Sequence, residues 1–136
     1  MKKLIIVTLL ALSIVLVGCS SPNDRPAASE AATVNKITAE EAKARLDGES
    51  GIILVDVRTQ DEYNVEHIPN AILLPVDNIV DDAETIIPDK EATYFVYCRS
   101  GNRSATASAQ LVEMGYKNIF DLGGIKDWPY EKVSVQ

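Results

Sequence analysis

Cys98 stands in a setting where a thiol could act as a nucleophile. It lies within Phe95–Gly115, FVYCRSGNRSATASAQLVEMG, where an apolar run ends at the cysteine and a helix of small residues follows. The N–H groups in the first turn of such a helix lack internal partners, and the helix dipole adds partial positive charge there. These groups favour the thiolate, which is the reactive form of cysteine. The alternative is a structural role for Cys98 as a small buried apolar residue at a strand end.

The six residues from Cys98 to Arg103 are expected to form the loop between that strand and that helix. Gly101 permits left-handed backbone geometry, so that successive N–H groups can turn inward as an anion-binding nest. Arg99 and Arg103 add full positive charges, which are disfavoured at a helix N-terminus unless an anion compensates them. The candidate anion-binding residues are therefore Arg99, Ser100, Gly101, Asn102 and Arg103.

Strands and helices are expected to alternate around this loop. Strands are predicted at 52–57, 71–75, 93–98 and 118–122, and helices at 38–48, from 59, at 78–87 and at 103–114. Thr38-Ala39-Glu40-Glu41 and Thr59-Gln60-Asp61-Glu62 are capping boxes that start the first two helices. The alternation predicts an α/β fold, a three-layer sandwich with a mainly parallel central sheet. Cys98 then lies at the carboxyl end of a strand, where chemistry gathers in open parallel sheets.

Composition limits the class of partner. The chain has 136 residues, of which 46% are apolar and 24% charged, and its formal net charge is −7. This balance suits one ordinary domain and argues against nucleic-acid binding, which requires a basic surface. The two cysteines have no zinc-site spacing. No metal or cofactor is implied, and a monomer is expected.

The N-terminus is predicted to be a targeting segment. Two lysines precede the apolar run Leu4–Val17, which is shorter than the ~20 residues that span a bilayer, so a cleaved signal is favoured. The tetrad LVGC, ending at Cys19, resembles the bacterial lipobox, which implies cleavage before Cys19 and a lipid on its sulfur. Residues 1–18 are then a lipoprotein signal peptide, 19–35 a lipidated cysteine with a flexible tether, and 36–136 the folded domain. The alternative is an ordinary signal with a chance cysteine.

Export follows from this interpretation. The domain is expected to face the periplasm or the extracellular side, held by the Cys19 lipid at the cell membrane or outer membrane. Cys98 would then be a lone thiol outside the cytoplasm, which calls for a functional explanation.

Three motifs resemble the rhodanese-like sulfurtransferases in their single-domain form. They are DVRTQDEYNVEHIPNAILLP from Asp56, YCRSGNRSATASAQL from Tyr97, and DLGGIKDW from Asp121, and the similarity covers about residues 36–130. The resemblance implies that Cys98 attacks the outer sulfur of an anionic donor such as thiosulfate, expels sulfite and carries a persulfide. Cyanide or a thiol then accepts the sulfur. Arg99 and Arg103 would bind the donor, and the loop amides would stabilise the persulfide.

Two other functions are weighed against this one. Phosphatases that use a cysteine place an arginine six positions after it, whereas position 104 is serine and Arg103 comes one position too early. The second is a low-turnover sulfur carrier or interaction module of the cell envelope. Ser100 stands where two-domain thiosulfate sulfurtransferases have a lysine, which puts thiosulfate itself in doubt as the physiological donor.

Several residues that look catalytic are expected to be structural. The resemblance assigns Asp56 to ordering nearby loops and Arg58 to pairing with a helix acid such as Glu62. His67, the only histidine, is expected to order a loop rather than act as a base. Asn70 replaces a glycine of the family signature, and asparagine tolerates the left-handed geometry that this position would require. Trp128 and Tyr130 are expected to pack.

Overall fold

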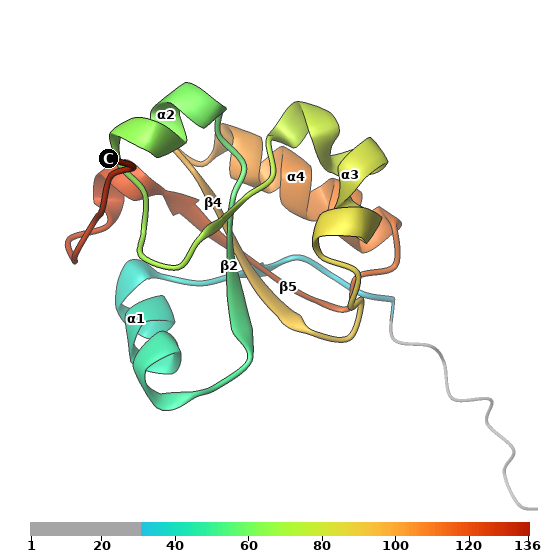
Figure 1. Ribbon diagram of the computed structural model, residues 1–136. Coiled ribbons are helices and arrows are strands. Elements are labelled where there is room, and N and C mark those ends of the chain that lie inside the picture. The colour runs from blue at the N-terminus through green and yellow to red at the C-terminus, as the bar shows by residue number, and fades with distance from the viewer. Residues whose placement is uncertain (1–30) are drawn as a thin grey trace, which may run out of the picture.

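The computed structural model describes residues 31–136 of the chain (Figure 1). Its strands are β1 (Asn35–Lys36), β2 (Ile52–Asp56), β3 (Ile72–Leu73), β4 (Thr93–Cys98) and β5 (Asn118–Gly124). Its helices are α1 (Ala39–Gly48), α2 (Gln60–Val65), α3 (Ile79–Ile86) and α4 (Asn102–Glu113), with short 3₁₀ turns η1 (Val76–Asn78) and η2 (Ile125–Asp127). The predicted alternation of strands and helices is confirmed.

Both predicted capping boxes are present. The Thr38 hydroxyl accepts a hydrogen bond from the main-chain N–H of Glu41 at 3.2 Å, and the Glu41 carboxylate accepts one from the Thr38 N–H at 3.0 Å. Thr59 and Glu62 repeat the arrangement at 3.3 and 3.1 Å. These bonds satisfy N–H groups that have no partner inside the helix, and thereby fix where α1 and α2 begin.

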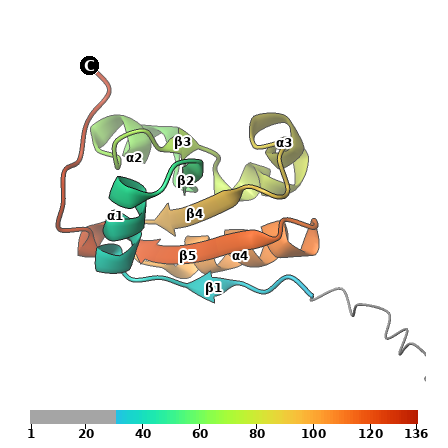
Figure 2. The ribbon, with the colours of Figure 1, turned by 90° about the horizontal axis from the view of Figure 1, so that it is seen from below.

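The strands form one parallel sheet in the order β1-β5-β4-β2-β3. The arrowheads of β4 and β5 in Figure 2 point toward the same end of the sheet, the end at which α2 lies. Cys98, the last residue of β4, is paired in register with Gly124, the last residue of β5. The fold therefore brings the predicted active-site loop beside the Gly-Gly segment that ends β5.

Helices cover both faces of the sheet, as the three-layer prediction requires. In Figure 1, α3 and α4 lie above the sheet and α1 lies below it. Two apolar clusters fill the spaces between these layers. The upper cluster includes Val96, Ile79 and Leu111, and the lower one includes Phe95, Ala42 and Trp128. Because successive residues of β4 point to opposite faces, both clusters are built on the same strand.

The loop before α4 is shorter than the sequence predicts. Helix α4 begins at Asn102 rather than at Arg103, so only Arg99–Gly101 is irregular. Gly101 precedes the helix with a φ of 106°, a left-handed conformation that turns the chain sharply. Because of this turn, only three residues separate β4 from α4, instead of the longer loop that the sequence predicts.

The N-terminal predictions fall largely outside the described part of the chain. The signal peptide, Cys19 and most of the tether precede residue 31, so they remain predictions. Within residues 31–136, every helix is too short or too polar to cross a bilayer.

Candidate active site

Cys98 lies under a cap of hydrogen-bond donors. Its side chain is almost completely buried at the end of β4, and the main-chain N–H of Gly101 donates to its Sγ at 3.0 Å. The N–H groups of Ser104, in the first turn of α4, and of Ser100 also favour negative charge on this sulfur. The nest expected from the sequence therefore exists, with donors that come from both the loop and the helix N-terminus.

These donors lower the pKa of the Cys98 thiol. Burial is the largest single influence and raises the pKa, since it penalises a charged sulfur. The N–H groups of Ser104, Gly101 and Ser100 and the hydroxyl of Ser104 together outweigh burial, so the pKa falls below its ordinary value. Neither arginine is among the leading causes. Activation of this thiol thus rests mainly on neutral dipoles around the sulfur, with a smaller electrostatic coupling to Arg103.

Ser104 links the sulfur to a buried carboxylate. Its hydroxyl donates to Oδ1 of Asp121 at 2.6 Å, and the Gly101 carbonyl oxygen lies 3.0 Å away. Asp121 is 1% exposed and also accepts the N–H of Gly123 and an ion pair from Lys36. A serine hydroxyl has one hydrogen, so Ser104 can give it either to Asp121 or to a charged Cys98 sulfur.

Sequence reasoning missed both Ser104 and Asp121. Ser104 is the third residue of α4, a position whose N–H lacks a helical partner, and this signal was available in the sequence. Asp121 lies 17 positions further along the chain, and only the pairing of β4 with β5 brings it to the site.

Gly124 allows β5 to touch the loop. A Cβ atom at this position would lie 2.5 Å from the Arg99 carbonyl oxygen and 2.8 Å from the Ser100 Cα, which is closer than atoms can approach. The main-chain N–H of Lys126 then donates to the same Arg99 oxygen at 3.3 Å. The Gly-Gly segment thereby buttresses the first residues of the active-site loop.

The two arginines of the loop differ in their surroundings. Arg103 donates from both terminal nitrogens to the Glu62 carboxylate, each at 2.7 Å. This pairing, opposed by burial and supported by bonds from Thr59, lowers the pKa of Glu62 to about 2. Arg99 and Asn102 are exposed, and no carboxylate of residues 31–136 is paired with Arg99. The compensating anion expected for cations at this helix start is thus Glu62, and it serves Arg103.

The predicted pairing of Arg58 with Glu62 is wrong. Arg58 instead contacts Asp56, with Nε–Oδ1 at 2.9 Å and Nη2–Oδ2 at 2.6 Å, and both side chains are buried. The reason is geometric: Arg58 folds back toward the end of its own strand, whereas the Glu62 side chain extends toward α4 and Arg103. The structural role expected for Asp56 agrees with these contacts.

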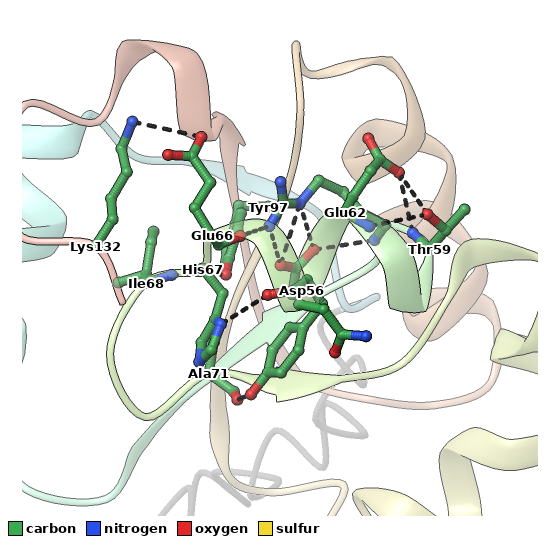
Figure 3. A network of polar contacts seen from close by, with 12 residues as sticks. Asp56, Thr59, Glu62, Glu66, His67, Ile68, Ala71, Tyr97 and Lys132 are labelled. Atoms are coloured by element: carbon green, nitrogen blue, oxygen red, sulfur yellow. Dashed lines mark hydrogen bonds and ion pairs between the residues drawn. The ribbon is translucent and has the colours of Figure 1, made fainter. Parts of the chain in front are cut away.

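Figure 3 shows the network around Asp56, which also includes Tyr97 and the loop after α2. Arg58 donates to the Glu66 carbonyl oxygen at 2.6 Å, and the Tyr97 hydroxyl accepts the Ile68 N–H at 3.1 Å. Burial and the neighbouring Asp56 carboxylate raise the pKa of Tyr97, so the phenol stays protonated. These bonds hold the chain from Glu66 to Ile68 against the ends of β2 and β4.

His67 belongs to the same loop. Its Nδ1 lies 2.9 Å from the Tyr63 carbonyl oxygen, its ring stacks on the Tyr63 ring at 3.8 Å, and its main chain bridges to Val133. Among residues 31–136 it makes no hydrogen bond to Cys98. Asn70 has a φ of 65°, which confirms the expected left-handed conformation.

The remaining aromatic residues pack as expected. Trp128 is 5% exposed, and its ring meets that of Tyr130 edge to face at 5.0 Å. Its indole N–H donates to the Glu131 carbonyl oxygen at 3.2 Å. Within the described part of the chain, no cluster of three or more histidine, cysteine and acidic side chains is placed to hold a metal ion.

This chain is similar to known proteins in sequence and in fold. A family model described as a rhodanese-like domain matches residues 38–131. Thiosulfate sulfurtransferase PspE of Escherichia coli is 39% identical over 79 residues, which are 58% of this chain and 76% of that protein. Thiosulfate sulfurtransferase GlpE of Coxiella burnetii is 40% identical over 78 residues, which are 57% of this chain and 71% of that protein. A solved structure, "rhodanese with anions from E. coli", superposes with a TM-score of 0.58 at 37% identity, covering 61% of this chain and 98% of that one.

Proposed function

The chain belongs to the rhodanese-like domain family and is a rhodanese-type sulfurtransferase, and we propose that Cys98 is its nucleophile and carries the sulfur as a persulfide. The observation that carries the proposal is the Gly101 N–H, which donates to the Cys98 sulfur at 3.0 Å within a nest of further donors. Such a nest holds a sulfur anion before, during and after transfer.

The proposed reaction has two steps and needs no external oxidant. The Cys98 thiolate attacks the outer sulfur of a thiosulfate-like anion, and the sulfur–sulfur bond of the donor breaks, its electron pair leaving with sulfite. The terminal sulfur now bears the negative charge of a persulfide. A nucleophilic acceptor, cyanide or a thiolate, then attacks that terminal sulfur and releases Cys98 as the thiolate.

The loop is proposed to hold the anions that take part. The N–H groups of Ser100, Gly101 and Ser104 stabilise the charge on sulfur, because the fold already holds them around it. Arg99 is exposed at the rim and available to the donor, with Asn102 beside the helix start. Arg103 is held by Glu62 through both terminal nitrogens, so less of its charge is available to the donor than that of Arg99.

Two measurements on one sample test the proposal. In a Cys19→Ser background Cys98 is the only thiol, so incubation with thiosulfate should add the mass of one sulfur atom to the chain, and cyanide should then release thiocyanate. Cys98→Ser in the same background should do neither. If the intact mass does not change, the persulfide proposal fails. If sulfur is added but no thiocyanate appears, the sulfur-carrier alternative is favoured.

We further propose that the protein is exported and anchored through a lipid on Cys19. The support is the sequence alone: two lysines, the apolar run Leu4–Val17 and the tetrad that ends in the cysteine. A cysteine modified in this way would carry two or three acyl chains, which is enough for stable anchoring. Cys19→Ala should abolish processing and membrane retention in the native host, and normal processing of that variant would refute the proposal.

A further inference from the structure

Almost every cation of the described chain is paired with a carboxylate. Residues 31–136 contain ten lysines and arginines, and eight of these make ion pairs. The two without a carboxylate partner in that range are Arg99 and Lys126. We call this pair the rim cations. In an acidic protein with a formal net charge of −7, the remaining cations could have been scattered over the surface, but these two are neighbours.

The main chains of the two rim cations are in contact, next to the end of β4. The Lys126 N–H donates to the Arg99 carbonyl oxygen at 3.3 Å, and Gly124 packs directly against that same peptide. Gly124 is in turn the register partner of Cys98. Lys126 therefore lies two residues after Gly124, the register partner of Cys98. Both rim cations are exposed. A lysine ammonium on its flexible stem adapts readily to a small anion.

Arg103 cannot replace them without breaking its own contacts. Both of its terminal nitrogens are engaged by Glu62 at 2.7 Å, so its charge is largely compensated within the protein. Ser100, in the middle of the loop, carries no charge. An incoming dianion therefore meets uncompensated positive charge only at the rim cations, as far as residues 31–136 are concerned.

We propose that Lys126, together with Arg99, binds the anionic sulfur donor and raises its concentration at Cys98. The inference deepens the proposed function, because it assigns the donor-binding charge to a residue of η2 outside the Cys98 loop. A donor with two negative charges, such as thiosulfate, gains more from the rim cations than a neutral donor does.

Alkylation of Cys98 measures this charge without requiring sulfur transfer. Iodoacetate carries a negative charge and iodoacetamide does not, so the ratio of their rates reports the potential at the sulfur. In a Cys19→Ser background, Lys126→Gln should lower the iodoacetate-to-iodoacetamide ratio about two- to threefold at low salt, the effect of one unit charge several ångströms away in water. The difference should shrink in 1 M salt.

Lys117→Gln is the matched control. Lys117 is also exposed, but it lies just before β5, at the opposite end of the sheet from Cys98, and pairs with Glu91. This substitution should leave the ratio unchanged. Iodoacetamide rates equal to those of the parent chain verify that the loop remains intact in each variant.

Steady-state kinetics supply the second measurement. Lys126→Gln should raise KM for thiosulfate about two- to threefold with kcat little changed, since the charge acts on donor binding. An alkylation ratio and a KM that both match those of Lys117→Gln would overturn the inference. A changed alkylation ratio in a chain that transfers no sulfur would support the rim cations and contradict the proposed function, so the two failures are distinguishable.

Discussion

Asp56 and Cys98 end neighbouring strands of the sheet, both side chains are buried, and yet their surroundings differ in one respect. Around Asp56 the polar groups are matched: its two oxygens accept bonds from the Arg58 side chain and from the Arg58 N–H. Around Cys98 the donors exceed what a neutral thiol can use, because a thiol is a weak acceptor.

This difference separates a structural polar cluster from a reactive one. In a matched cluster, further charge on one group is not stabilised by the others. Removal of one member leaves its partner unpaired and lowers the stability of the fold. A site with surplus donors becomes more favourable when negative charge appears on its central atom. Asp56, Arg58 and His67 are residue types common in active sites, but the bonds of Asp56 to Arg58 and of His67 to the Tyr63 carbonyl oxygen favour a structural role for them.

Substitutions of Cys98 and of His67 should differ most in their effect on sulfurtransferase activity. Cys98→Ser should reduce thiocyanate formation by at least about a thousandfold, because a serine hydroxyl is a far weaker nucleophile than a thiolate. His67→Asn should retain activity per folded molecule within a few-fold, since His67 contacts Tyr63 and Val133 rather than the sulfur. The comparison would be broken by a His67→Asn variant that folds and is inactive.

Removal of one partner from the matched cluster should act on stability. Arg58→Met leaves the Asp56 carboxylate buried without its partner, and we expect a loss of about 3–5 kcal/mol in the free energy of unfolding in urea. The fraction that remains folded should still transfer sulfur at the parent rate. Lys43→Met, at an exposed pair on α1, is the control and should cost less than about 1 kcal/mol. Equal losses in the two variants would contradict the distinction.

Removal of one surplus donor should act on Cys98 itself. Ser104→Ala removes one of the groups that lower the pKa of Cys98, so the iodoacetamide rate profile should shift to higher pH and the rate at neutral pH should fall. Ser108→Ala, one turn further along α4, removes a buried hydroxyl that has no partner and should leave the profile unchanged. Identical profiles for both variants would exclude a role for Ser104.

The smallest expected effect concerns the pair between Glu62 and Arg103. Because folding lowers the pKa of Glu62 to about 2, the pair contributes stability at pH values above the ordinary glutamate pKa and loses it as pH falls toward 2. Glu62→Gln should therefore reduce the free energy of unfolding by about 1 kcal/mol or less at neutral pH, with the difference from the parent vanishing near pH 2. Glu113→Gln is the control, and a difference independent of pH would contradict the assignment.

Local signals predicted most of the fold. Capping residues such as Thr38 and Thr59 fixed helix starts, and the apolar run ending at Cys98 located the central strand, because these features act between residues close in sequence. Family resemblance pointed to Cys98 and its loop, and the nest of N–H groups was deducible from the helix start. The lengths of the elements were less predictable. The strand expected at 71–75 is only two residues long, because only Ile72 and Leu73 pair with β2.

Partners across the sheet could not be predicted from the sequence. Glu62 was assigned to Arg58, four residues away, but it binds Arg103, which is 41 residues away. The same limitation hid the bond between Ser104 and Asp121 and the contact between Lys126 and Arg99. Each of these depends on strand order and register, which bring distant segments to one end of the sheet.

The rate of Cys98 alkylation by iodoacetamide as a function of pH tests the central claim most directly. In a Cys19→Ser background, surplus donors around the sulfur predict a midpoint below the ~8.5 of an ordinary cysteine. A midpoint at or above that value would show that burial dominates, and the account of Cys98 as a stabilised thiolate would be contradicted.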